Sequence, residues 1–182
     1  ATALEFQSVS SDFVKLATST ISANTASVSF DGYFTSAYDT YIIYGNAVEQ
    51  DANSRLRLQV RKSNADVTSS NYYAIAFGYN SDGTGDDVSV SAAGYFNLTD
   101  NTGGSTNYRT GFQTIIYNPL STYYQMIKNT SSYYGALSNS KVTWIEMAGF
   151  CNNNTNALSG VTYSLSAGNF DSGTIVLYGV KK

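Results

Sequence analysis

The residues that most often perform chemistry in proteins are scarce in this chain. There is no histidine among the 182 residues, which removes Ser-His-Asp and Cys-His triads and the usual zinc sites. The single cysteine, Cys151, is predicted to be a small buried hydrophobe at the end of a strand. No glycine-rich loop follows a strand and opens a helix, so no phosphate cradle is indicated. We therefore expect no catalytic residue set, no cofactor and no enzyme activity.

Paired carboxylates remain as a source of chemistry, and Glu146 is the acid in the most unusual position. Most of the 13 acids lie in turn-forming clusters, but Glu146 lies in an apolar strand beside Trp144. A carboxylate on an apolar face is costly unless it is paired or at an edge. Glu146 is therefore interpreted as a sheet-edge or subunit-contact acid, or as the partner of an arginine. The alternatives are a glycan-contacting acid beside Trp144 and a catalytic acid of the glycosidase type.

Tyrosines are the best candidates for binding, because the chain has 16 of them. Three adjacent pairs occur, at Tyr72 and Tyr73, Tyr123 and Tyr124, and Tyr133 and Tyr134. Neighbours in a strand point to opposite faces, so one ring of each pair is expected in the core and one outside. The outer rings would form platforms for sugar rings or for a partner subunit. The alternative is that both rings of each pair serve only in packing.

A weak candidate for a metal site is the segment 80–87. Asp82, Asp86 and Asp87 are interleaved there with glycines, and their oxygens suit a calcium ion. The segment lacks the helices and the terminal glutamate of an EF-hand. A plain hairpin connection accounts for the same turn-forming residues without a metal, so the primary expectation is no metal.

The elements that must position these residues show the two-residue period of β-strands. In the segment 55–61, Leu56, Leu58 and Val60 alternate with polar residues, which indicates a half-buried strand. Further strands are predicted at 13–21, 25–30, 38–48, 72–79, 88–98, 110–117, 123–128, 142–151, 160–166 and 173–180. About ten strands separated by turn signals predict an all-β, antiparallel β-sandwich. Residues 1–20 are expected to be a first strand or an N-terminal arm, and 21–182 a single sandwich domain.

Arginines occupy the polar face of the 55–61 strand. Arg55, Arg57 and Arg61 share that face, and it is interpreted as solvated or, alternatively, as meeting acids of a neighbouring subunit. A nucleic-acid-binding protein would need a larger basic stripe, and the net charge here is −3. No apolar stretch approaches the roughly 20 residues that a membrane span requires. No signal peptide is visible, so we expect synthesis in a cytoplasm, no nucleic-acid partner and no membrane insertion.

Several segments together resemble small β-sandwich structural proteins of tailed bacteriophage virions. They include Phe34 followed by Tyr38-Asp39-Thr40-Tyr41, the Leu56 to Val60 strand, Asn118-Pro119, and the closing Gly173-Thr174-Ile175-Val176-Leu177-Tyr178-Gly179-Val180. The opening Ala3-Leu4-Glu5-Phe6 is similar to the start of stand-alone virion proteins. The resemblance implies a jelly-roll-like sandwich, usually a homotrimer, attached to the virion surface. A fibre would need a shaft or an anchoring region before this domain, and at most about twenty residues precede it.

The sequence and this resemblance together give two functional expectations. The first is a non-enzymatic capsid decoration or cement protein that binds the assembled head as an oligomer, with the major capsid protein as partner. The second is a tail-fibre or receptor-binding adhesin, a carbohydrate-binding module for host surface glycans. Trp144, Glu146 and the paired tyrosines are the residues expected to bind in that second case.

Overall fold

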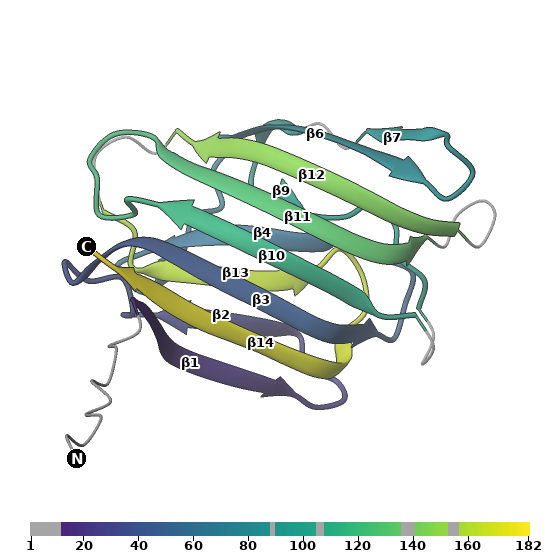
Figure 1. Cartoon of the computed structure of the whole chain (residues 1–182), viewed down its shortest axis with the longest axis horizontal. Coiled ribbons are helices and arrows are strands. Elements are labelled where there is room, and N and C mark those ends of the chain that lie inside the picture. The colour runs from purple at the N-terminus through teal and green to yellow at the C-terminus, as the bar shows by residue number, and fades with distance from the viewer. Residues whose placement is uncertain (1–11, 88–89, 105–107, 136–140, 153–156) are drawn as a thin grey trace, which may run out of the picture.

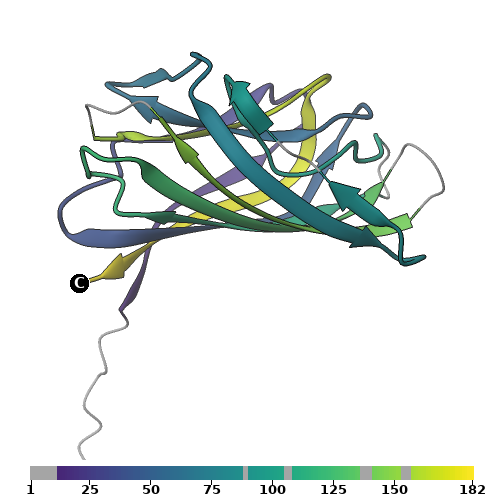
Figure 2. The ribbon, with the colours of Figure 1, turned by 90° about the horizontal axis from the view of Figure 1, so that it is seen from above.

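The chain folds into two antiparallel β-sheets packed face to face (Figures 1 and 2). The computed structural model describes residues 12–87, 90–104, 108–135, 141–152 and 157–182. Within those ranges it contains fourteen strands and no helix, and so no helix that could cross a membrane. The predicted all-β, antiparallel sandwich is therefore confirmed.

The larger sheet has nine strands, in the order β1-β14-β3-β10-β11-β12-β6-β7, with β8 also paired to β6. Its strands are β1 (Phe13–Ile21), β3 (Tyr38–Gln50), β6 (Tyr72–Asn80), β7 (Gly85–Asp87), β8 (Val90–Ala93), β10 (Thr110–Tyr117), β11 (Gln125–Gly135), β12 (Lys141–Cys151) and β14 (Phe170–Lys181). The continuous apolar run Tyr41-Ile42-Ile43 lies in β3, between β14 and β10, as a central strand requires.

The smaller sheet has five strands and lies behind the larger one in Figure 1. Its strands are β2 (Ser27–Asp31), β4 (Leu56–Lys62), β5 (Ala65–Asp66), β9 (Phe96–Asn97) and β13 (Gly160–Leu165), in the order β2-β13-β4-β5, with β9 also paired to β4.

One hydrophobic core fills the space between the two sheets. Strand alternation points Leu56, Leu58 and Val60 of β4 into it, and each is at most 1% exposed. Ile145 and Met147 of β12 enter the same core from the larger sheet and are fully buried. Cys151 is buried there as well, as its sequence context predicts.

The largest error in the predicted strands concerns the segment 88–98. It was expected to be one strand, but it contributes β8 to the larger sheet and β9 to the smaller one. The chain therefore crosses between the sheets after Ala93, a change that a two-residue period does not reveal. The short strands β5 and β7 lie where no strand was predicted, and β11 runs to Gly135, well past the predicted end at Lys128.

A buried carboxylate joins the middle strands near one end of the larger sheet. Glu49 of β3 is 7% exposed and accepts hydrogen bonds from Arg109 Nε at 2.7 Å and from Ser172 Oγ at 2.6 Å. The hydrogen bond from Ser172, with that from Arg109, holds the pKa of Glu49 below its ordinary value. The charged form of Glu49 therefore stabilises the folded state.

Replacing Gly160 by alanine tests how tightly β13 packs against β2. A methyl group at Gly160 would overlap the Phe30 carbonyl oxygen and lie 2.8 Å from Asp31 Cα, which are backbone atoms and cannot move aside cheaply. We expect Gly160→Ala to lower the free energy of unfolding by about 1–3 kcal/mol in urea titrations. Gly111→Ala in β10 is the control, because nothing lies within 4 Å of its added methyl group. An unchanged Gly160→Ala midpoint would contradict this packing.

The pH dependence of stability tests the Glu49 cluster. Because the pKa of Glu49 is lower in the folded chain than its ordinary value of 4.5, its contribution is present above about pH 4.5. It is lost as the pH falls through the folded-state pKa. We expect Glu49→Gln to lower Tm at pH 7, and the gap from wild type to shrink in acid. Asp39→Asn, which removes an exposed ion pair with Lys182, is the control and should change Tm little at either pH.

Candidate binding face

The outer face of the larger sheet is covered with exposed apolar side chains. This is the face turned toward the viewer in Figure 1, away from the smaller sheet. Its most exposed members include Ile75 at 67%, Tyr79 at 59% and Val142 at 58%. We define the apolar face as Tyr73, Ile75, Phe77 and Tyr79 of β6, Val142, Trp144, Ala148 and Phe150 of β12, Met126 of β11 and Tyr117 of β10.

Strand register brings these side chains together in rows across the sheet. Phe150 lies opposite both Tyr73 and Met126, and Met126 lies opposite Tyr117. The rings of Tyr73 and Phe150 stack with centroids 5.4 Å apart. At the other end of the face, Trp144 meets Phe77 edge to face at 6.1 Å. The apolar face therefore consists of rows of cross-strand neighbours rather than of scattered single residues.

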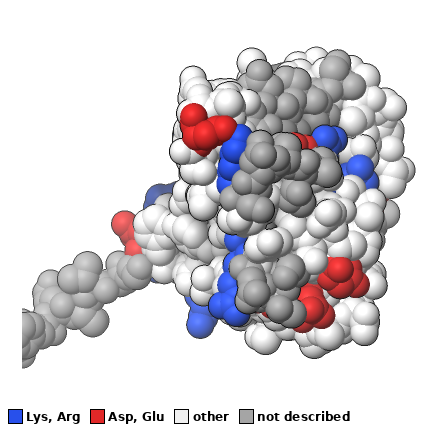
Figure 3. Space-filling model, turned by 90° about the vertical axis from the view of Figure 1, so that its right-hand side faces the viewer, with Lys and Arg blue, Asp and Glu red and all other residues white. Residues whose placement is uncertain are grey.

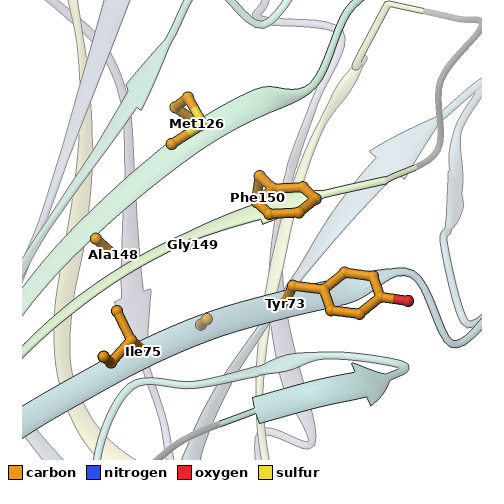
Figure 4. Close-up of a pocket in the computed structure, with 7 residues that line it drawn as sticks. Tyr73, Ile75, Met126, Ala148, Gly149 and Phe150 are labelled. Atoms are coloured by element: carbon orange, nitrogen blue, oxygen red, sulfur yellow. The ribbon is translucent and has the colours of Figure 1, made fainter.

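A shallow pocket of about 480 Å³ opens in the apolar face. Tyr73, Ile75, Met126 and Phe150 stand around the small residues Ala148 and Gly149 (Figure 4), and Ala74 completes the lining. Small-molecule sites of this size usually combine apolar walls with a few convergent polar groups. The only side-chain polar group here is the phenol of Tyr73, whose oxygen points away from the pocket centre in Figure 4. The pocket suits an apolar side chain better than a polar ligand.

One ion pair interrupts the apolar face. Glu146 of β12 binds Lys128 of β11, and both side chains point outward. The hydrogen bond from Lys128 to Glu146, and the charge of that carboxylate, raise the pKa of Lys128. Glu146 was expected at a sheet edge, at a subunit contact or beside an arginine, and the subunit contact stays a prediction. Instead its strand lies inside the sheet, between β11 and β6, and its partner is a lysine.

Of the tyrosine pairs, only Tyr123 and Tyr124 are exposed in both members. Tyr123 is 81% and Tyr124 52% exposed, and they precede β11 instead of lying within it. Strand alternation therefore does not apply to them, and the expectation of one core ring was wrong. Tyr124 packs on Phe150 at 5.1 Å and so extends the apolar face.

Tyr133 and Tyr134 do lie in a strand and point to opposite sides. Tyr133 is 3% exposed, and its hydroxyl accepts a hydrogen bond from the Asp100 backbone N–H. Tyr134 is half-buried and stacks on Tyr108 with ring centroids 4.5 Å apart. Tyr133 is thus a core residue, and Tyr134 is largely occupied by a ring of its own chain.

The structure describes the side chain of only one of the three aspartates of the calcium candidate, Asp82. Asp82 binds Lys141 and accepts hydrogen bonds from Thr84, and the bond from Lys141, then those from Thr84, lower its pKa. The Asp82 carboxylate therefore stabilises the turn between β6 and β7 through Thr84, and it ties this turn to β12 through Lys141. The side chains of Asp86 and Asp87 lie outside the described residues. Among the described side chains, no group of three acids, cysteines or histidines could hold a metal.

The arginine row lies on the outer face of the smaller sheet and is paired within the chain. Arg55 binds Asp100 at 2.7 Å, and Arg61 binds Asp66 at 2.6 Å. Arg57 lies 3.8 Å above the Tyr95 ring. Acids of the same chain therefore meet Arg55 and Arg61, and contact of this row with acids of a neighbouring subunit stays a prediction. Acidic and basic side chains are also interspersed at the end of the molecule that Figure 3 shows.

Sequence reasoning missed the β6 part of the apolar face. Large residues alternate with small ones in this strand, and the large ones are normally assigned to the core. The structure has the opposite arrangement, because Ala76 and Gly78 face inward while Ile75, Phe77 and Tyr79 face outward. The alternation of large with small residues in β6 was the feature of the sequence that could have revealed these outward-facing side chains.

A matched pair of isoleucines tests whether the apolar face serves folding. Ile145 of β12 is fully buried, whereas Ile75 of the neighbouring β6 is 67% exposed. We expect Ile145→Ala to lower the free energy of unfolding by about 2–5 kcal/mol. Ile75→Ala should change it by no more than about 0.5 kcal/mol in dilute solution. Urea titrations compare the two, and equal losses would show that the face is needed for the fold itself.

Comparison of the chain with protein-family models, with curated proteins and with solved structures found no match.

Proposed function

We propose that this chain is a non-enzymatic binding and assembly protein whose apolar face contacts another protein. The observation that carries the proposal is the apolar face, which the described residues leave exposed although they pack a well-buried core. Contiguous exposed apolar surface of this kind marks interaction sites on soluble domains. Aromatic residues and methionine are also enriched at protein interfaces.

The chemistry of the face favours a protein partner over a small substrate. The side chains that define the face have no hydrogen-bonding groups except the tyrosine hydroxyls and the Trp144 indole N–H. Between them lie the Lys128–Glu146 pair and the hydroxyls of Thr130 and Ser132. Glu146 is engaged by Lys128, which works against a role as a catalytic acid. General acid–base catalysis needs a carboxyl group free to exchange its proton with a substrate.

We further propose that the protein to which this domain contributes is a virion surface structural protein of a tailed bacteriophage. Capsid decoration, as a cement protein on the major capsid protein, is the leading assignment. The resemblance of the strand segments to such proteins supports this placement, together with the sandwich fold that they imply. The jelly-roll connectivity and the trimer implied by the same resemblance stay predictions.

A second candidate function is a tail-fibre adhesin that binds host glycans. The cluster of Tyr124, Phe150 and Tyr73 favours it, because exposed rings beside one another can stack on sugars. Tyr123, at 81% the most exposed large apolar residue among those that the structure describes, precedes Tyr124 in the chain. Hydrogen-bonding side chains around these rings are sparse, so this function ranks second.

Immunogold electron microscopy of particles from the producing cells tests the proposal. We expect label over the head, and at least a tenfold loss of label for the variant Phe77→Ser with Trp144→Ser. Tyr33→Ser, which changes an exposed ring outside the apolar face, is the control and should keep full label. Label confined to the tail tip would favour the adhesin. Particles without label would contradict the virion assignment.

A further inference from the structure

We propose that the partner on the apolar face is a second copy of this chain, related to the first by a two-fold axis. This inference rests on the proposed function, in which the face is a protein contact. It departs from the homotrimer that the resemblance implies, and the dimer and the trimer are alternatives. Two observations carry it beyond that function: the arrangement of charge on the face, and its size.

The two charges on the apolar face are complementary to the same two charges on a second copy of the face. Lys128 and Glu146 form one positive and one negative site near the middle of an apolar surface. Their side chains are 44% and 26% exposed, so any partner that covers the face must bury both. Burying an ion pair is costly unless each charge gains further partners. A surface that offers a lysine to Glu146 and a carboxylate to Lys128 is needed, and a second copy of the face provides both.

The geometry of the pair fixes how the two copies meet. Lys128 lies opposite Ala148 and Glu146 lies opposite Thr130, so the two charges are diagonal neighbours on β11 and β12. A two-fold axis in the plane of contact, crossing between the charges, places Lys128 of each copy over Glu146 of the other. Four charges then alternate in sign, and every charge has two opposite neighbours. An axis along the line joining them would stack lysine on lysine, which is repulsive.

The same axis exchanges the two apolar sides of the face. Phe77 and Trp144 lie on the Glu146 side of the pair, whereas Met126 and Phe150 lie on the Lys128 side. The bulky rings of one copy are therefore brought to the side of the other copy that contains the pocket. This is the self-complementary contact of an isologous dimer.

The size of the face is sufficient for a stable dimer. The four neighbouring strands β6, β12, β11 and β10, at about 4.8 Å spacing and about ten residues of about 3.3 Å each, span roughly 630 Å². Standard interfaces bury about 600–1,000 Å² on each partner. The outer face of the smaller sheet offers no comparable surface, because its arginines are already engaged by Asp66, Asp100 and Tyr95.

A charge-exchange experiment tests the two-fold contact. Lys128→Glu makes the centre of the face wholly acidic, and Glu146→Lys makes it wholly basic. We expect each variant alone to be a monomer near 19.6 kDa in sedimentation equilibrium, while the wild type has twice that mass. An equimolar mixture of the two variants should regain the dimer mass, because an acidic face then meets a basic one. Lys15→Glu, an equal charge change in β1 outside the apolar face, should leave the dimer intact.

The outcomes separate this inference from the proposed function. Circular dichroism of each variant establishes that it is folded before its mass is measured. A monomeric or trimeric wild type, single variants that still dimerise, or a mixture that stays monomeric would each overturn the two-fold contact. The head label on particles is scored independently. If the protein is monomeric in solution but labels particles, the dimer is rejected and the proposed function is retained. If the protein is a dimer but particles carry no label, the virion function is rejected and the dimer is retained.

Discussion

A β-sheet has two faces, and the part of the chain that the structure describes covers only one face of the larger sheet. Strand alternation sends every second side chain of β6, β12 and β11 away from the smaller sheet. The core between the sheets is complete without those side chains, as the full burial of Ile145 and Met147 indicates. The outer side chains therefore take no part in the core. The proposed function and the proposed dimer both follow from this asymmetry between the two faces.

The asymmetry is greatest in β6, where small residues are buried and large apolar residues are exposed. Ala76 and Gly78 face the core, and a methyl group at Gly78 would come within 2.6 Å of Ile145 Cγ1. Large side chains therefore have no room inside at this point. Ile75, Phe77 and Tyr79 take the outer positions instead, where they cost the fold little and supply apolar surface.

The two outer faces of the sandwich present side chains of different chemistry. β4 presents arginines and a glutamine, each held within the chain: Arg61 by Asp31 and Asp66, and Gln59 by the Gly94 carbonyl. β6 and β12 present rings and aliphatic groups around a single ion pair. Internally satisfied polar groups suit water, whereas uncovered rings are better buried against a partner.

The two-residue period was enough to predict an antiparallel sandwich and the half-buried β4, because alternation is a local property of the chain. It also placed Trp144 and Glu146 on one face of one strand. It did not reveal that 88–98 divides between the sheets, nor that Tyr123 and Tyr124 precede β11. The side of β6 that faces outward, and the lysine that meets Glu146, depend on which strands become neighbours. Pairing between distant segments is set by the packing of the whole chain, so only the tertiary structure decided where the apolar face lies and what it contains.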